Sequence, residues 1–256
     1  MKKSTLNKTF IYLFGTLFII VLWTIISFFF DENDLIFPSL FKVLTYAFNL
    51  LHNSYFYLCL FKTLYRVLIG FIISLLLALF FGTFSGISDN FRYFIEPTIT
   101  FIRSVPTAPL ILILLVAIGA LNAPIYIVIF TSFPVLYEST YNGYANVNKN
   151  IKDIFKLDCG NSIVAFVKIF FPSAIPYILV GIVSSFGLSF KIEIMAEVLI
   201  GSSMPGLGSA ISTVQRIDPT NVVGISAYAI IAVIIVLVID LALKPISSIF
   251  KDKISE

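Results

Sequence analysis

Long apolar runs, separated by short polar stretches, set the pattern of this sequence. A helix that crosses the hydrocarbon core of a bilayer needs about 20 mostly apolar residues. Helices are the expected form of these runs, because lipid offers no hydrogen-bond partner to an unpaired backbone group. The pattern predicts six transmembrane helices, the third of them short, at residues 9–30, 67–87, 109–121, 123–141, 174–200 and 222–243.

The composition agrees with a membrane protein and disfavours other classes of protein. Of the 256 residues, 59% are apolar and 12% are charged, and the mean hydropathy is +1.00. Soluble domains are about 45–50% apolar and about 25% charged, and a soluble chain of this length could not bury so much apolar surface. A soluble enzyme, a disordered chain and a free nucleic-acid binder are therefore disfavoured. We predict one all-α polytopic membrane domain over residues 1–256.

The distribution of lysine and arginine predicts the orientation in the membrane, because cytoplasmic loops carry an excess of these residues. When the N-terminus is placed in the cytoplasm, six helices put most of the 17 basic residues on the inner side. Lys191 then falls inside a span, and the outer side receives Lys42, Lys62, Arg66 and Arg216. We therefore expect both termini in the cytoplasm. Topology, rather than a nucleic-acid partner, explains the net charge of +3.

Motifs typical of catalysis or metal binding are nearly absent from the sequence. There is no G-x-x-x-x-G-K-[ST] phosphate loop and no H-E-x-x-H motif, and His52 is the single histidine. The predicted topology puts the bilayer between Cys59 and Cys159, which forbids a disulfide. We expect no catalytic residue, no metal and no cofactor. Such a chain is a channel, a gradient-driven secondary transporter or one subunit of a larger machine, and no convincing inverted repeat favours the transporter.

The predicted inner connection at residues 142–172 distinguishes these alternatives. At about 30 residues it is far longer than a turn between neighbouring helices. Its first part places Ile151, Ile154 and Phe155 at helical spacing among charged residues, which predicts a short amphipathic helix outside the bilayer. Such a helix needs a surface on which to bury Ile154 and Phe155. The pattern alone leaves open whether that surface is its own membrane domain, the lipid headgroups or a partner protein.

The spacing within this connection carries a resemblance to a known family. The segment from Asp153 to Cys159 is followed, nine residues later, by the run from Ile169 to Pro172. This arrangement resembles the loop E-A-A-x-x-x-G-x(9)-I-x-L-P of inner-membrane permease subunits in binding-protein-dependent ABC importers. The positions at which this chain differs from the motif are Asp153, Ile154, Phe155, Cys159 (which Gly160 follows) and Phe171.

Further stretches resemble the same family, in the same order and along most of the chain. They are Phe37-Pro38-Ser39, Thr63 to Gly70, Glu96-Pro97, Arg103 to Pro109, Ala196-Glu197 and Gly206-Leu207-Gly208. Together they point to the branch that includes nitrate, sulfonate, taurine and thiamine-precursor permeases. The resemblance implies a type I ABC importer permease-like fold in the cytoplasmic membrane of the cell.

The resemblance also implies how such a chain works. Two permease subunits, by default a homodimer, form the pathway for a small solute, which an extracytoplasmic substrate-binding protein delivers. Two copies of a cytoplasmic ABC ATPase subunit bind the coupling helix and drive alternating access, so this chain is not expected to be an enzyme itself. Nothing in the sequence identifies the solute. The residues that the resemblance assigns to ATPase coupling are Asp153, Ile154, Phe155, Lys156, Cys159, Gly160, Ile169 and Pro172.

Three ionisable residues in the fifth predicted span are candidates for the translocation pathway, because charges within a membrane are functional by default. They are Lys191, Glu193 and Glu197. Glu193 and Glu197 are four residues apart on one helical face and would repel each other unless they are paired or hydrated. In one interpretation this face lines a water-accessible pathway and Lys191 attracts an anionic solute. In the other, Glu197 lies at the outer headgroups and Lys191 snorkels or bridges to a neighbouring helix.

Prolines and glycines predict local features at three other places. The prolines between residues 97 and 109 indicate either an interfacial helix and turn before the third span or a broken entry into it. Gly82 and Gly86 fit the G-x-x-x-G pattern of close helix packing, a pattern that also arises by chance. Gly206-Leu207-Gly208 predicts a turn at an outer helix end.

Overall fold

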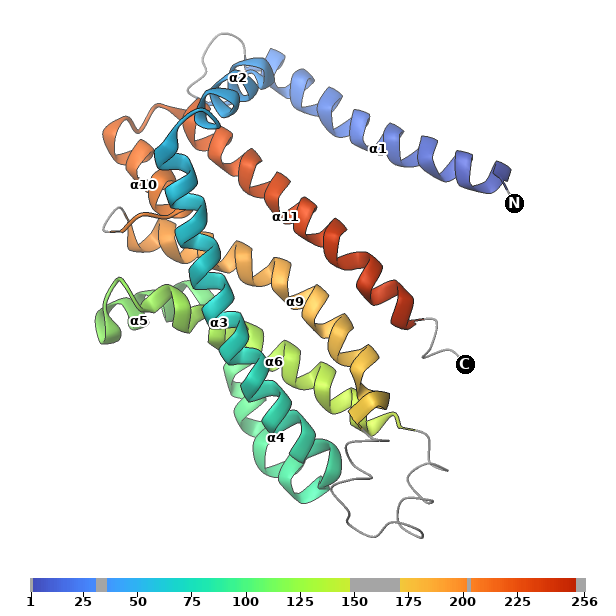
Figure 1. Cartoon of the computed structure of the whole chain (residues 1–256). Coiled ribbons are helices and arrows are strands. Elements are labelled where there is room, and N and C mark those ends of the chain that lie inside the picture. The colour runs from blue at the N-terminus through green and yellow to red at the C-terminus, as the bar shows by residue number, and fades with distance from the viewer. Residues whose placement is uncertain (1, 31–35, 148–170, 202–203, 252–256) are drawn as a thin grey trace.

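A computed structural model describes residues 2–30, 36–147, 171–201 and 204–251, and the regular elements in this part of the chain are all α-helices (Figure 1). Each of the six predicted apolar spans lies largely within a helix of the described residues, so the all-α fold class is confirmed. The helices are α1 (Lys2–Phe29), α2 (Leu40–Leu50), α3 (Ser54–Ile87), α4 (Asp89–Ser104), α5 (Thr107–Ile118), α6 (Ala123–Ala145), α9 (Phe171–Ile200), α10 (Leu207–Ile217) and α11 (Val222–Lys251).

Three segments among the described residues are long and apolar enough to cross a bilayer as single helices. They are Ser54–Ile87, Ala174–Ile200 and Val222–Leu243, and they contain three of the predicted spans. The first of them begins at Ser54, well before the predicted residue 67. At this start the side chain of Asn53 accepts a hydrogen bond from the N–H of Tyr55 and caps α3. Because α3 starts early, Arg66 lies inside the helix and not in an outer loop.

The centre of the molecule is a bundle in which α6 packs between α3 and α9. A Cβ built on Gly82 of α3 would lie only 2.7 Å from Cβ of Thr140 in α6. One turn further along, Gly86 lies directly against Tyr144. Small residues allow such close backbone approach between membrane helices. The predicted G-x-x-x-G contact is therefore real, and it joins α3 to α6.

The two ends of this bundle have different neighbours (Figure 1). At one end, Gly143 of α6 lies against Ala174 of α9. We call this the loop end, because the connection at residues 142–172 starts and finishes there. At the other end, the last turns of α9 pack against α10. We call this the α10 end.

Helices α4 and α5 form a pair with a sharp bend of 97° between them. The break comes at Pro106, which precedes the first residue of α5, while Pro97 is accommodated inside α4. Proline has no N–H to donate, which suits the first turn of a helix. The pair therefore consists of an amphipathic helix, a turn and a short apolar helix. Both interpretations of the prolines, an interfacial helix and turn before the third span and a broken entry into it, are compatible with this bend.

Helix α1 diverges from the bundle, and its C-terminal part contacts the region of α2 (Figure 1). The Trp23 indole N–H donates to the carbonyl of Pro38 at 3.2 Å, and its ring packs 4.9 Å from that of Phe37. α2 is amphipathic and packs along α11. The contacts of Trp23 attach the C-terminal part of α1 to the segment that precedes α2.

Candidate functional site

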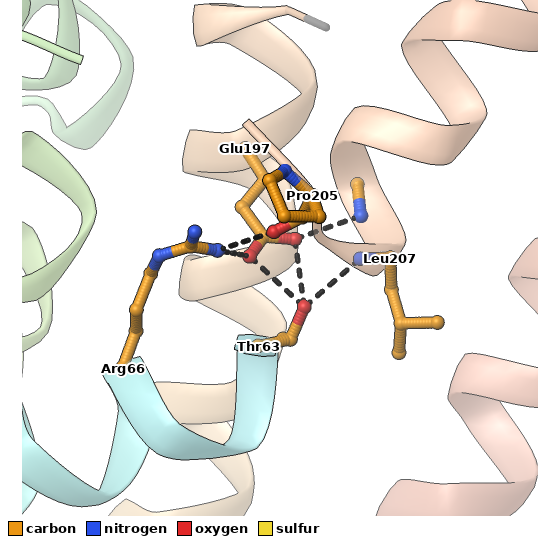
Figure 2. Close-up of polar contacts among 6 residues, drawn as sticks. Thr63, Arg66, Glu197, Pro205 and Leu207 are labelled. Atoms are coloured by element: carbon orange, nitrogen blue, oxygen red, sulfur yellow. Dashed lines mark hydrogen bonds and ion pairs between the residues drawn. The ribbon is translucent and has the colours of Figure 1, made fainter. Parts of the chain in front are cut away.

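Glu197, near the end of α9, is fully buried and lies at the centre of a group of polar contacts (Figure 2). Its carboxylate accepts a hydrogen bond from Nη1 of Arg66 at 2.7 Å and another from the N–H of Gly208 at 2.9 Å. The hydroxyl of Thr63 lies 2.9 Å from both carboxylate oxygens and donates to this carboxylate. We call Thr63, Arg66, Glu197 and the first turn of α10 the Glu197 cluster.

Arg66 is the positive partner in the Glu197 cluster. Its side chain is 9% exposed, and Nη1 also donates to the carbonyl of Pro205 at 3.0 Å. A buried charge that has no partner costs several kcal/mol, so Arg66 and Glu197 can each be buried because the other is present. The ion pair joins α3 to α9 and to the segment that leads into α10.

The first turn of α10 is held by the same cluster. The N–H of Leu207 donates to Oγ1 of Thr63 at 2.9 Å, and the N–H of Gly208 donates to Glu197. The first N–H groups of a helix have no partner within the helix, and this end of the helix dipole favours a negative charge. Thr63 accepts one hydrogen bond and donates another, so a single hydroxyl links the carboxylate of α9 to the backbone of α10 (Figure 2).

The glycines of the Gly206-Leu207-Gly208 motif make this close packing possible. A Cβ on Gly206 would collide with the carboxylate of Glu197. A Cβ on Gly208 would collide with the carbonyl of Ile194 and would lie 2.7 Å from Cβ of Glu197. The motif is at a helix end, as the sequence predicts. Its glycines are needed because α10 starts directly against α9.

The burial of the two charged side chains of this cluster was not predicted from the sequence. The charge distribution places Arg66 on the outer aqueous side, and one interpretation places Glu197 at the lipid headgroups, whereas the structure buries both. Counting charges treats each cation as solvated and does not reveal a carboxylate that is 131 residues away in the chain. A signal was present, because Thr63 and Arg66 share a helical face and a carboxylate in an apolar run needs a donor.

Glu193 lies one turn before Glu197 and is also fully buried. Within the described residues, neither of its carboxylate oxygens has a hydrogen-bond partner. The two glutamates of one helical face therefore have different environments, because Glu197 is paired and Glu193 is not. In this structure neither of them lines an open, water-accessible surface.

Lys191, the third pathway candidate, is separate from this pair. Its side chain is exposed and lines a cavity between α9 and α11, together with Asp240 of α11. The structure thus does not bring Lys191 together with Glu193 and Glu197. Of the three candidates, only Lys191 lines this cavity.

Most of the predicted ATPase-coupling residues lie outside the described part of the chain, and their role stays a prediction. These are Asp153, Ile154, Phe155, Lys156, Cys159, Gly160 and Ile169. Pro172 is the second residue of α9 and is exposed. The structure does describe both ends of the connection, which meet where Gly143 lies against Ala174.

Among the described residues, no three histidine, cysteine, aspartate or glutamate side chains lie close enough together to hold a metal ion. The Glu197 cluster itself contains one carboxylate, already occupied by three donors. The cluster has a structural role, because its ion pair and hydrogen bonds hold α3, α9 and α10 together. Each of its polar side chains is already bonded, so none is free to react.

Comparison with known proteins gives sequence relatives and a similar structure. A permease protein of an ABC transporter from Brucella melitensis is 28% identical over 179 residues, which cover 70% of this chain and 72% of the relative. The aliphatic sulfonates transport permease protein SsuC of Bacillus subtilis is 29% identical over 184 residues, covering 66% of this chain and 62% of SsuC. A chain from the crystal structure of an amino acid ABC transporter with histidines superposes with a TM-score of 0.63 at 19% identity, over 79% of this chain and 95% of that one.

The sequence profile of a family described as "Binding-protein-dependent transport system inner membrane component" matches residues 70–255. This match covers most of the chain and includes α6, α9, α10 and the connection at residues 142–172. It confirms the resemblance to importer permeases and the type I permease fold, and the chain is a multi-pass membrane subunit of an ABC importer. The chain belongs to the family of inner-membrane components of binding-protein-dependent transport systems.

Proposed function

We propose that this importer subunit couples ATP hydrolysis on a partner chain to alternating access of a solute pathway, and that the connection at residues 142–172 receives the movement of the ATPase. The observation that carries the proposal is the position of the two ends of this connection. A Cβ built on Gly143 would lie 3.0 Å from Cα of Ala174, so the chain leaves and re-enters the membrane domain at one place. A pull on such a segment acts on α6 and α9 together.

Contacts along α6 and α9 support the transmission of this movement. Midway along the helices, the hydroxyls of Ser132 and Ser189 lie 2.6 Å apart and are buried. At the α10 end, Glu197 of α9 is bonded to α3 and α10. Coupling between distant sites is carried by packed side chains, hydrogen-bond networks and rigid elements. α9 provides such a connection from the loop end to the Glu197 cluster.

In this proposal the loop end faces the cytoplasm, together with both chain termini, and the α10 end faces the extracytoplasmic binding protein. The excess of basic residues near the loop end and the termini supports this orientation. Two copies of the ATPase subunit and a second copy of this permease complete the complex. Since a separate chain supplies the ATPase, we infer that this subunit is not an enzyme.

We assign different roles to the three ionisable residues of α9. Lys191 lines a cavity and is assigned to the solute pathway. Glu197 is assigned to holding the helices, because each of its oxygens is already bonded. Glu193 is buried beside this lock without a hydrogen-bond partner among the described residues, and its assignment to the pathway rests on the sequence alone.

The experiment that tests the coupling role is the substitution Phe155→Asp in the permease co-expressed with its ATPase subunit. An apolar anchor that docks in a protein cleft does not tolerate a charge, because burying an unpaired carboxylate is costly. We expect the ATPase to be lost from the affinity-purified permease, while the amount of permease in the membrane stays the same. The measurement is the ratio of the two subunits after purification.

The matched control is Phe155→Leu, which keeps an apolar side chain and is expected to retain the ATPase. Retention of the ATPase by both variants would refute the coupling role of this connection. Solute uptake by vesicles that contain only this polypeptide, without nucleotide, would refute the whole proposal in favour of a secondary transporter.

A further inference from the structure

A cavity of about 450 Å³ opens between α9 and α11, away from the Glu197 cluster. Its size falls within the range of about 300–1,000 Å³ that is usual for small-molecule sites. The residues that line it are Val183, Ser184, Gly187, Leu188, Lys191 and Asp240. The cavity thus combines an apolar wall with one cation and one anion from two different helices.

The two charged side chains reach the cavity from two different helices, Lys191 from α9 and Asp240 from α11. Asp240 extends from α11 over the backbone of α9, since a Cβ built on Gly187 would lie 2.7 Å from Oδ1 of Asp240. Lys191 stands one turn beyond Gly187 on α9. A helical side chain leans toward the N-terminus of its helix, which directs Lys191 back toward Gly187 and the cavity. Gly187 leaves the space that the carboxylate of Asp240 occupies.

Neither charge is neutralised within the described part of the chain. Lys191 and Asp240 form no ion pair with each other, and no described residue forms a hydrogen bond or ion pair with either side chain. Charged residues inside a membrane face a water-filled cavity or pair with a partner of opposite charge. The Arg66–Glu197 pair shows how this protein buries charges that serve structure. Lys191 and Asp240, in contrast, have no partner of opposite charge among the described residues and line the cavity.

We propose that this cavity binds a small zwitterionic solute on the translocation pathway, with Lys191 holding its acid group and Asp240 holding its cationic group. This inference rests on the proposed function, because it assigns the cavity to the pathway of the importer. Val183 and Leu188 contact the carbon skeleton of the solute. The hydroxyl of Ser184, which donates to the carbonyl of Gly181, offers its lone pairs to a solute ammonium.

The presence of Asp240 distinguishes a zwitterion from a simple anion. Lys191 alone would suit any small anion, but a fixed carboxylate in the same cavity repels a solute that carries only negative charge. A solute with an amine alone is repelled by Lys191 for the same reason. A solute that carries both an acid group and an amine offers an opposite charge to Lys191 and to Asp240, and so compensates both side chains for the water that it displaces.

The test measures protection of a cysteine in the cavity, in the complete importer with its ATPase in membrane vesicles. Ser184→Cys is introduced into a chain in which Cys59 and Cys159 are replaced by alanine, and its rate of reaction with a water-soluble maleimide is followed. The probes are glycine, β-alanine and 2-aminoethanesulfonate. Their single-charge counterparts are acetate, propionate, ethanesulfonate, methylamine and ethylamine.

We expect the cysteine to react, because the cavity is wet, and at least one zwitterion to slow the reaction about tenfold while the single-charge counterparts do not. Lys191→Gln and Asp240→Asn should each abolish the protection. Lys62→Gln, which removes a lysine remote from the cavity, should leave it unchanged. If the Ser184→Cys protein does not fold, Leu188→Cys reports on the same cavity.

A cysteine that does not react, protection by no zwitterion, or equal protection by the single-charge counterparts would each overturn the proposal. So would protection that persists in either Lys191→Gln or Asp240→Asn. The result is independent of the coupling test, because labelling reports on the cavity and co-purification reports on the connection at residues 142–172. Failure of the cavity proposal is therefore distinguishable from failure of the coupling role.

Discussion

The two ends of the α3–α6–α9 bundle are held together by different kinds of contact. At the α10 end, α3 and α9 are joined by a buried ion pair and by hydrogen bonds that also hold α10. At the loop end, α3, α6 and α9 are joined by close backbone approach at Gly82, Gly86 and Gly143, without charges. The α10 end relies on a buried ion pair, whereas the loop end relies on the fit of small residues and on a neutral hydrogen bond from the Tyr137 hydroxyl of α6 to Oγ of Ser85 in α3.

This difference follows from the environment of membrane helices. Apolar side chains gain little by leaving lipid for another helix, because lipid tails are equally apolar. Dispersion contacts at small residues and polar bonds between helices must therefore supply the association. Polar bonds prescribe one geometry, since Glu197 cannot leave Arg66 without exposing an unpaired buried charge. Small-residue contacts weaken gradually as helices separate. The described helices α3, α6 and α9 share no ion pair at the loop end, so we expect their positions to change there at lower cost than at the α10 end.

The largest expected effect is that of Glu197→Gln, which keeps the size of the side chain but removes its charge. Arg66 is then left buried without a counter-charge, and we expect the free energy of unfolding to fall by about 3–5 kcal/mol. The measurement is thermal unfolding in detergent, followed by reaction of a fluorogenic dye with the buried thiol of Cys59 in a Cys159→Ser chain.

Glu193→Gln is the matched control for this substitution, one turn away and equally buried. Because Glu193 has no hydrogen-bond partner among the described residues, neutralising it removes no stabilising interaction and should not lower the free energy of unfolding. Equal losses for the two variants would show that the Glu197 cluster contributes nothing beyond the burial of a carboxylate.

An intermediate effect is expected for Thr63→Val, which replaces the bridging hydroxyl with a methyl group. The change removes a bond to a charged group and leaves the N–H of Leu207 without an acceptor, at a combined cost of about 2–4 kcal/mol. Thr140→Val provides the comparison at the loop end, because Thr140 is equally buried and donates only to Leu136 of its own helix. That bond adds little to helix stability, so its loss should be nearly neutral. Similar melting temperatures for the two variants would contradict the assignment of Thr63 as a bridge.

The smallest expected effect is that of Gly82→Ala at the loop end. The added methyl group meets Thr140 and forces α3 and α6 apart, which costs about 1–3 kcal/mol for overpacking. Gly15→Ala in α1 is the control, because a Cβ there meets nothing within 4 Å, and we expect it to be neutral or slightly stabilising. The same thermal unfolding measurement applies. If Gly82→Ala is as stable as the control, close packing does not hold the loop end together.

Local features of this protein were predictable from the sequence because they depend on residues that are near one another in the chain. The apolar runs predicted helices, and the spacing at Gly82 and Gly86 predicted a helix contact. The family resemblance also rested on spacing within short stretches, and the family match confirms it. The coupling residues around Phe155 stay a prediction, because they lie outside the described residues.

Features that depend on pairing between distant segments were missed or left open. From the sequence, Arg66 is interpreted as a solvated cation before the start of a span. In the structure α3 already begins at Ser54, and Arg66 lies within it and pairs with Glu197. The sequence also treats Lys191 and Glu197 as members of one group, whereas α9 presents them to different neighbours. Both differences arise because the rotation of a helix about its axis is set by the helices packed around it.

The sequence by itself determined that this chain is a bundle of membrane helices, since a run of about 20 apolar residues can satisfy its backbone in lipid only as a helix. The spacing of residues within short stretches of the sequence also indicated that the chain belongs to an importer family. Only the tertiary structure decided which charges neutralise each other within the bundle and which remain open toward a cavity. The physical reason is that the interaction between two charges depends on their separation in space, and 131 residues of chain separate Arg66 from the carboxylate 2.7 Å away.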